Sequence, residues 1–453
     1  MALIAVFLLA QTWAPAAVPG EKLLVIGPAA FEETLKPFVA FKQQTIATRW
    51  HSLEKILSAS AGVDDPERLK QFLYHQWRDH GLSHVLLVGD IDIMPVRYMV
   101  LDRVTAAAQD YAFYPSDLYY ADLAKADKSF ETWNAQRSGF HAGYFGEVRG
   151  EKNKADPINY DQIDYLPEIA VGRWPVTTPE EAWQVADKTI RHEKLFSQES
   201  ACPGRAAFIS VGGWVDTRSL LDRLASKMGK GWQIEKLYYS DEPSAPTAPI
   251  PNHTEVRRLF NQGLGLALHT GHGQPDAWEQ CFSLKDLDHI TNTTHLPIVV
   301  SAGCSTATFA PLPPYHAYVD VEGAEHAGTD HGEVFKAPPP PPAPYQCGRY
   351  NLTGLGEQLL KKGANGAVAY IGCNTGSQPC GLTLAEGFIN AVASTKHPRL
   401  GDCWNDAVRF YHRREKLATL KPDEDWYPPS IFFQAMKFMV FGDPTLRLPS
   451  PEM

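Results

Sequence analysis

Two residues with nucleophilic chemistry follow two successive apolar runs in the second half of the chain. His272 stands between two glycines after the run 264–270, and Cys304 follows a glycine after the run 296–302. Short apolar runs of this kind are typical of buried parallel strands. Since neighbouring parallel strands share a crevice at their carboxyl ends, we expect the imidazole and the thiol to face one ligand.

A thiol beside an imidazole can attack a carbonyl carbon. A free thiol titrates near ~8.5 and the thiolate is the attacking form, so His272 would act first as base and later as acid. The backbone amides of Gly273 and Cys304 could hold the oxyanion that forms. If each residue is considered alone, a structural interpretation is favoured: His272 would end a strand in a glycine-rich turn, and Cys304 would be a buried thiol. Their pairing at two strand ends favours catalysis.

The sequence around both residues resembles the histidine and cysteine motifs of the gingipain-like cysteine peptidases, relatives of caspases and legumains in clan CD. The blocks that carry this resemblance are 269–278 and 300–309, and further family landmarks follow the family order at 85–90, 94–95, 167–175 and 440–445. The resemblance implies a caspase-like α/β/α sandwich with mostly parallel sheets in two subdomains. It also implies a cysteine-type endopeptidase that acts on proteins or peptides.

Two positions near the motifs have alternative interpretations. The family carries an acid after the strand that precedes the histidine strand, but glycine stands there in this chain, and Asp216 follows a few residues later. Asp216 could orient the imidazole or bind a basic substrate side chain; alternatively, it could cap a helix over 217–227. Trp278 matches the family's aromatic after the histidine, as a substrate pocket wall or as a core residue. The P1 preference stays open.

Two other functions remain as alternatives. His269, His272 and Asp276 could support a metal-assisted hydrolase, or the fold could serve a catalytically silent binding protein. Cysteine peptidase chemistry requires no cofactor, although the family resemblance allows structural calcium.

Composition indicates an ordinary folded protein of 453 residues, 44% hydrophobic and 21% charged. The net charge of −10 without a basic cluster argues against nucleic acid as a partner. The apolar stretch 3–10 and the small residues 14–16 predict a secretory signal over residues 1–16, hence a secreted or periplasmic protein with no membrane span in the mature chain. The absence of Lys or Arg near the start leaves an uncleaved anchor open.

Seven cysteines leave at least one unpaired, and export would allow up to three disulfides among the other six. Strands and helices alternate along the chain, which predicts an α/β fold. We expect a companion subdomain over 17–200 and a catalytic subdomain over 201–453. Helices are expected over 31–44 and from Thr178 to about 196. Strands are expected near 23–26, 85–88, 168–171, 206–211, 264–270, 296–302 and 367–371. The segment 117–161 is expected to be a surface loop. The proline-rich insertion 312–350 is expected to form a lid or an autoprocessing loop, or less readily to hold a metal.

Overall fold

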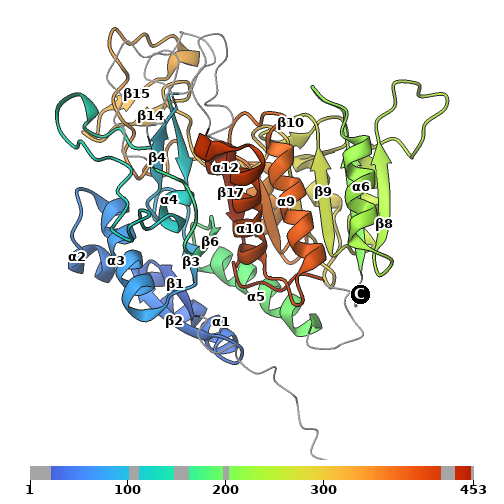
Figure 1. The fold of residues 1–453 in the computed structure, drawn as a ribbon, viewed down its shortest axis with the longest axis horizontal. Coiled ribbons are helices and arrows are strands. Elements are labelled where there is room, and N and C mark those ends of the chain that lie inside the picture. Colours follow the sequence, from blue (N-terminus) through green and yellow to red (C-terminus); the bar gives the residue numbers. More distant parts are fainter. Residues whose placement is uncertain (1–21, 102–111, 147–162, 197–203, 420–433, 450–453) are drawn as a thin grey trace, which may run out of the picture.

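The computed structural model describes residues 22–101, 112–146, 163–196, 204–419 and 434–449 (Figure 1). The predicted signal segment 1–16 and the residues 197–203 around the expected subdomain boundary lie outside the described residues. Within the described part, no helix is both long and apolar enough to cross a membrane.

One sheet of ten strands runs through the molecule (Figure 1). Every neighbouring pair in it is parallel except β16 and β17, which are antiparallel. The strand order is β2 (Ala47–Ser52), β1 (Lys22–Gly27), β3 (His84–Val88), β6 (Ala170–Trp174), β17 (Phe438–Phe441), β16 (Ala369–Cys373), β13 (Ile298–Ser301), β9 (Leu266–Thr270), β7 (Arg205–Ser210) and β8 (Gln233–Tyr238). The predicted strands are confirmed, with ends shifted by up to three residues.

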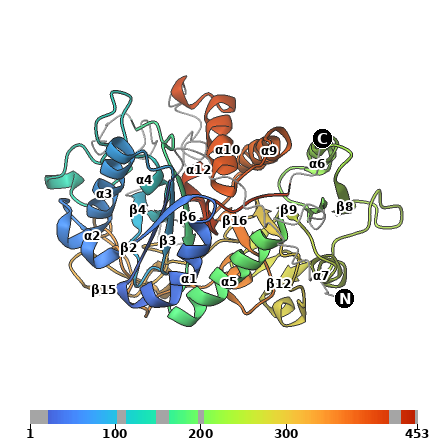
Figure 2. The ribbon, with the colours of Figure 1, turned by 90° about the horizontal axis from the view of Figure 1, so that it is seen from below.

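Helices cover both faces of this sheet, as predicted (Figure 2). One face carries α1 (Glu32–Lys42), α5 (Pro179–Phe196), α7 (His253–Asn261) and α8 (Leu355–Lys361). The other carries α2 (Leu53–Ala59), α3 (Asp65–His80), α4 (Leu118–Ala121), α6 (Arg218–Met228), α9 (Gly381–Ser394) and α10 (Leu400–Arg414). The helix expected from Thr178 is confirmed as α5. The Thr178 hydroxyl caps its start by accepting a hydrogen bond from the Glu181 amide at 3.2 Å.

The last strand, β17, joins the two halves of the chain. It lies between β6 of the first half and β16 of the second. The strands on the two sides of the β16/β17 junction run in opposite directions, so the carboxyl ends of the two halves lie at opposite edges of the sheet. The sheet is thus continuous across the boundary expected near residue 200.

A buried arginine explains one pair of sequence landmarks. Arg173, in β6, donates two hydrogen bonds of 2.7 Å to the carboxylate of Asp117. It also donates to the carbonyl oxygens of Gly89, Met94 and Pro95. The guanidinium is completely buried. These bonds fasten the loop after β3 to the segment before α4.

A second buried ionic group explains the landmark at 440–445. Asp443 pairs with Lys42 of α1 at 2.8 Å, and Lys42 also pairs with Glu193 of α5 at 2.7 Å. Thr445 donates to Asp443 from both its amide and its hydroxyl. The turn after β17 is therefore tied to the helices beneath the first half of the sheet.

The prediction of a surface loop over 117–161 is wrong for the buried part of the described stretch, whereas residues 126–129 and 135–140 are exposed as expected. Helix α4 is buried along its whole length, and Trp133 is buried with its indole nitrogen donating to Asp122 at 2.7 Å. The polar composition of this stretch favours exposure, but its aromatic residues are buried because they fill the space between α3 and β6. Residues 147–161 lie outside the described part.

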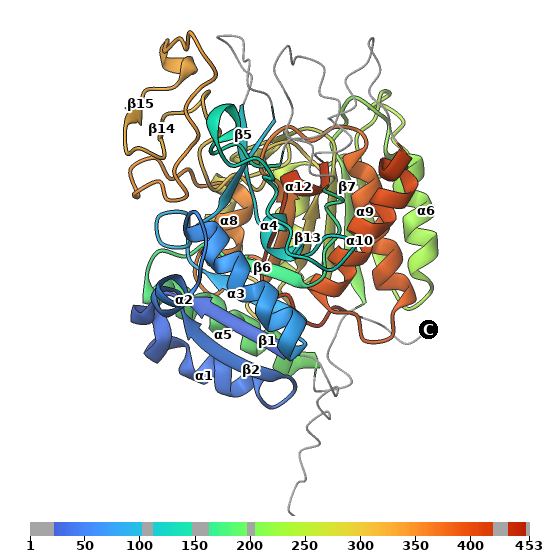
Figure 3. The same ribbon diagram turned by 60° about the vertical axis from the view of Figure 1, so that its left-hand side comes forward.

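The insertion 312–350 packs on the first half of the molecule (Figure 3). Its short hairpin of β14 (Tyr318–Val319) and β15 (Glu325–His326) lies near the ribbon of β4 (Arg97–Val100) and β5 (Phe113–Ser116). The amides of Ala112 and Phe113 both donate to the Pro313 carbonyl at 2.9 Å. Tyr144 donates to the Pro339 carbonyl at 2.9 Å.

Removing the Arg173 side chain with Arg173→Met should lower the free energy of unfolding by about 3–5 kcal/mol, because the Asp117 carboxylate is left buried without its partner. Urea denaturation measures the change. Arg68→Met is the control: Arg68 pairs with Asp65 at a partly exposed site, so its loss should cost less than about 1 kcal/mol. Equal losses for the two variants would contradict the role given to Arg173.

His326 should make the insertion sensitive to pH. Its ring nitrogens lie 2.9 Å from Asp320 and 3.0 Å from Glu333. Burial lowers the pKa of His326, but the hydrogen bonds to Asp320 and Glu333 together with the charges of these two carboxylates outweigh burial and raise it. The ion pairs of protonated His326 with Asp320 and Glu333 stabilise the folded insertion. This stabilisation is complete below the unfolded pKa of about 6.5, and it is lost as the pH rises through the higher pKa of the folded state.

Limited proteolysis within 312–350 should therefore be slower at about pH 6 than at about pH 8.5. His326→Gln should abolish most of this difference while leaving cleavage elsewhere unchanged. A difference that persists in the variant would assign the pH effect to other groups.

Candidate active site

The strands β7, β9 and β13 present their carboxyl ends at one edge of the sheet. Ser301 of β13 pairs with His269 of β9, and the Ala302 amide donates to the His269 carbonyl at 2.9 Å. The loops that follow β9 and β13 carry His272 and Cys304. The strand register therefore brings these two loops to the same place.

Glycine allows the two loops to touch through their backbones. A Cβ atom on Gly273 would lie 2.5 Å from Thr306 Cγ2 and 2.8 Å from the Cys304 carbonyl oxygen. A Cβ atom on Gly303 would lie 2.8 Å from His269 Cε1. Real Cβ contacts are not this short, so any larger residue at these positions would push the loops apart.

A third glycine seats the histidine loop against the loop after β7. Gly271 has φ +108°, and a Cβ there would lie 1.9 Å from the Gly212 carbonyl oxygen. The His272 amide donates to that same carbonyl at 3.0 Å, while the His272 carbonyl accepts from the Glu279 amide at 3.2 Å. The backbone on both sides of the imidazole is held in place.

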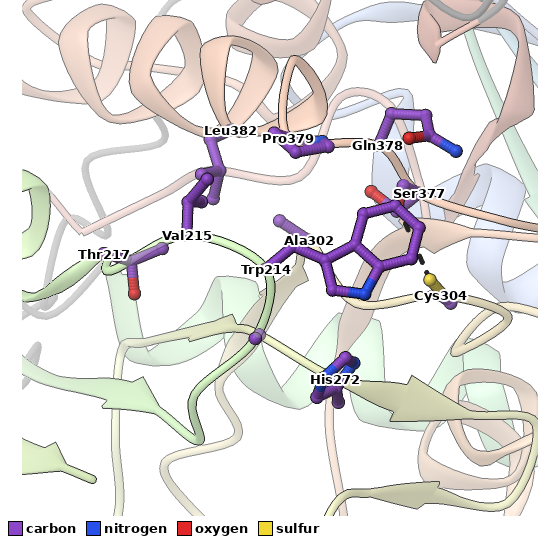
Figure 4. A pocket seen from close by; sticks show the side chains of 12 residues that line it. Trp214, Val215, Thr217, His272, Ala302, Cys304, Ser377, Gln378, Pro379 and Leu382 are labelled. Carbon is purple, nitrogen blue, oxygen red and sulfur yellow. Dashed lines mark hydrogen bonds between the residues drawn. The ribbon is translucent and has the colours of Figure 1, made fainter. Parts of the chain in front are cut away.

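His272 and Cys304 line one cavity of about 410 Å³, including the space open to solvent (Figure 4). The lining residues are Gly213, Trp214, Val215, Thr217, Gly271, His272, Ala302, Cys304, Ser377, Gln378, Pro379 and Leu382. They come from the loops after β7, β9, β13 and β16 and from the start of α9. None of them belongs to the insertion 312–350, so the structure does not support the expected lid.

The Cys304 sulfur is partly exposed and lies 3.5 Å from the Ser377 carbonyl oxygen, toward which its thiol points (Figure 4). Ser305 follows it with φ +56°, a left-handed conformation that costs about 1–2 kcal/mol for a residue with a side chain. Its amide donates to the Thr375 carbonyl at 2.8 Å, and its carbonyl accepts from the Thr308 hydroxyl at 2.7 Å. These bonds hold the strained turn that presents the thiol.

Asp216 does not line the cavity. Its carboxylate accepts hydrogen bonds from the Arg218 amide and guanidinium, each at 2.9 Å. Hydrogen bonding to Arg218 lowers the pKa of this carboxyl. Asp216 lies one residue before the capping position of α6, which Thr217 occupies. Its carboxylate accepts from the amide of Arg218, the first residue of the helix, so Asp216 lies at the helix start but is not its cap. No described side chain hydrogen-bonds to the His272 imidazole.

Trp278 lies in the core and not in the cavity wall. It belongs to a small sheet of β10 (Gly273–Gln274), β11 (Ala277–Trp278) and β12 (Phe282–Ser283). Its ring is fully buried and stacks on His269, with 4.6 Å between the ring centroids. Its indole nitrogen donates to the Tyr370 hydroxyl at 3.2 Å. This placement matches the core interpretation of the residue.

His269 is a buried neutral histidine. Its Nδ1 lies 2.9 Å from the Ser301 hydroxyl, which also accepts from the Thr306 hydroxyl at 2.9 Å. Burial lowers the pKa of His269 to about 3. Among the described residues, no group of three His, Cys, Asp or Glu could hold a metal. The geometry of the described residues therefore gives the metal-assisted alternative with His269, His272 and Asp276 no support.

One charged residue near the thiol could not be found from the sequence. Lys437, the last residue of α12 (Gln434–Lys437), is buried and donates to the Gly376 carbonyl at 3.4 Å. Gly376 precedes Ser377, the carbonyl partner of Cys304. Burial lowers the pKa of Lys437, while the thiols of Cys373, Cys380 and Cys304 oppose that shift. Lys437 stands far along the chain from Cys304, and no motif marks it.

The six described cysteines carry free thiols: Cys281, Cys304, Cys347, Cys373, Cys380 and Cys403. No disulfide forms among them, so the expectation of up to three bridges is not met in the described part. Burial raises the pKa of the Cys281, Cys373 and Cys403 thiols to about 12, which keeps them protonated and unreactive.

The α/β/α sandwich and the cavity at its sheet edge define the caspase-like class of folds. Peptidase family C25 matches residues 17–449, and the chain belongs to this family. The resemblance to gingipain-like peptidases is thereby confirmed.

Proteins of Porphyromonas gingivalis are among its relatives. Gingipain R2 is 23% identical over 302 residues, which cover 64% of this chain and 32% of that protein. Lys-gingipain is 23% identical over 300 residues, which cover 64% of this chain and 14% of that protein. The matched part is thus about a third or less of each relative's length.

Two solved structures share the fold. The crystal structure of the Arg-specific cysteine proteinase gingipain R aligns with a TM-score of 0.60 and 17% identity, covering 95% of this chain and 79% of that one. The complex of the Porphyromonas gingivalis RgpB pro- and mature domains aligns with a TM-score of 0.60 and 18% identity, covering 95% and 80%.

His269 should make stability depend on pH in the acid range. Between the unfolded pKa of about 6.5 and the folded value of about 3, the unfolded chain binds a proton that the folded chain does not. The free energy of unfolding should therefore fall as pH decreases, by about 1.4 kcal/mol per pH unit from this group. His269→Gln should remove that part of the slope in urea denaturation between about pH 6 and pH 4. An unchanged slope would contradict the assignment.

Proposed function

We propose that this protein is a cysteine endopeptidase that hydrolyses peptide bonds through Cys304 and His272. One observation carries the proposal: both residues line one cavity, on loops whose backbones are in contact at Gly273 and Gly303. Family membership supports the same chemistry. The activity and the substrates of the relatives are extended to this chain only as part of the proposal.

The proposed reaction has two stages. His272 takes the thiol proton as Cys304 Sγ attacks the peptide carbonyl carbon; it then gives the proton to the leaving amine as the C–N bond breaks. Water then attacks the thioester, with His272 as base, and releases the acid product and the free thiol. Each stage draws on the chain's own groups, without a cofactor.

The negative oxygen in each stage needs hydrogen-bond donors. The Cys304 amide donates to no protein acceptor within the described residues, and the Gly273 backbone is in contact with it. We assign the oxyanion to these two amides. The backbone bonds of His272 position its imidazole, and the proposal gives Asp216 no part in proton transfer, because Arg218 occupies its carboxylate.

The proposal also places the protein outside the cytoplasm, in the periplasm or secreted, on the basis of residues 1–16. The apolar stretch 3–10 and the small residues 14–16 support it. N-terminal sequencing of the exported protein tests this part, with a new terminus near residue 17 as the expected result. A chain that remains in the cytoplasm would contradict it.

Cys304→Ala and His272→Ala should each reduce peptide hydrolysis by at least about 1,000-fold, because each removes a group that takes part in bond making or proton transfer. Cleavage of a mixed peptide library, read by mass spectrometry, measures the loss. Cys347→Ala is the matched control, since it removes an exposed thiol outside the cavity, and it should keep full activity. Folded wild-type protein that cleaves nothing, and whose Cys304 reacts with no peptidyl warhead, would favour the catalytically silent binding protein.

A further inference from the structure

The walls of the cavity beside Cys304, as far as the structure describes them, carry no carboxylate, ammonium or guanidinium group. Among its twelve lining residues there is no Asp, Glu, Lys or Arg. The side chain of the residue whose carbonyl is attacked must lie close to the thiol, because the scissile carbon bonds to the sulfur. The chemistry of these walls therefore bears on the choice of P1 residue.

Apolar side chains form most of the cavity walls. Trp214 and Val215 project from the loop after β7, and both are exposed, at 69% and 40%. Pro379, in the loop before α9, and Leu382, in its first turn, face them, and Ala302 directly follows β13 (Figure 4). This arrangement offers a substrate side chain contact with carbon atoms on several sides.

The polar side chain at the α6 end of the cavity already has partners. The Thr217 hydroxyl lies 2.8 Å from the Ser210 hydroxyl and 2.8 Å from the Thr270 hydroxyl. All three residues are buried. Their hydrogen bonds are made within the protein, so Thr217 offers little to a charged ligand.

Two carboxylates close to Arg218, at the start of α6, are also occupied. Arg218 donates to Asp216 and to Asp241, each at 2.9 Å. Two glycines, Gly212 and Gly213, stand in the stretch where the family pattern leads one to expect an acid, and a Cβ on Gly213 would lie 3.2 Å from Gly271 Cα. The close approach of these two loops leaves little room for an acidic side chain.

We propose that this cavity is an S1 subsite for uncharged apolar side chains of medium size, such as those of leucine, norleucine and methionine. The proposal rests on the cysteine peptidase function proposed above. A buried ammonium or guanidinium without a carboxylate partner is strongly disfavoured. Basic P1 residues are therefore poor substrates of this protein, and acidic ones are excluded for the same reason.

The test compares peptides that are identical except at P1. Norleucine and lysine form the sharpest pair, because their side chains have the same carbon skeleton and differ by one ammonium group. We expect kcat/KM to be at least about 50-fold higher for the norleucine peptide, in line with the cost of an unpaired buried charge. Equal or faster cleavage of the lysine peptide would overturn the proposal.

A variant with an added carboxylate tests the location of the subsite. Val215→Asp should raise kcat/KM for the lysine peptide and lower it for the norleucine peptide. The ratio of kcat/KM for norleucine to that for lysine should therefore fall, or drop below one. Val215→Asn is the matched control: it has the same shape without the charge, and it should not favour lysine. A ratio that is the same in Val215→Asp and Val215→Asn would place the P1 side chain elsewhere and overturn the proposal.

The outcomes separate this inference from the function on which it rests. Lysine-directed cleavage that Cys304→Ala abolishes would overturn the apolar subsite and leave the peptidase intact. No cleavage of either peptide by folded wild-type protein, together with no labelling of Cys304 by a norleucine chloromethyl ketone, would overturn both. Labelling by the norleucine reagent but not by the lysine reagent supports both.

Discussion

Contact between two loop backbones is the constraint on which the candidate site depends. Gly273 and Gly303 follow adjacent parallel strands, and neither has room for a Cβ atom. Only this close approach brings the loop of His272 onto the loop of Cys304. Because β9 and β13 are hydrogen-bonded inside a continuous sheet, the positions at which the two loops begin are fixed relative to each other. The sheet is therefore the rigid support of the site.

The sequence landmarks outside the cavity serve this support. Arg173 and Asp443 belong to two of them, and each is the centre of a buried ionic group that ties loops to helices. Both are completely buried. Loss of one partner would leave a buried charge, which is more costly than loss of an exposed ion pair. Their part is to hold the first half of the sheet against β17 and thereby against the half that carries the thiol.

The charge states of the groups around the cavity are set by burial more than by ion pairs. His269 lies directly beneath the site but is kept neutral by burial. Lys437 is buried and donates to the Gly376 carbonyl, one residue before the carbonyl partner of Cys304. The cavity walls that the structure describes carry no acidic or basic side chain other than the His272 imidazole. Walls of this kind are poorly suited to charged substrate side chains.

The sequence by itself was enough for the alternation of strands and helices, the strand ends at His272 and Cys304, and the family. These depend on local apolar runs and on glycine, which short stretches of sequence reveal. Burial was decided by tertiary structure: Trp278, Tyr119 and Trp133 lie in the core, and the Asp216 carboxylate is bound by Arg218. Lys437 came beside the thiol because β17 inserts between the two halves of the sheet. Such placements depend on which distant elements pack together, and no local pattern in the chain encodes them.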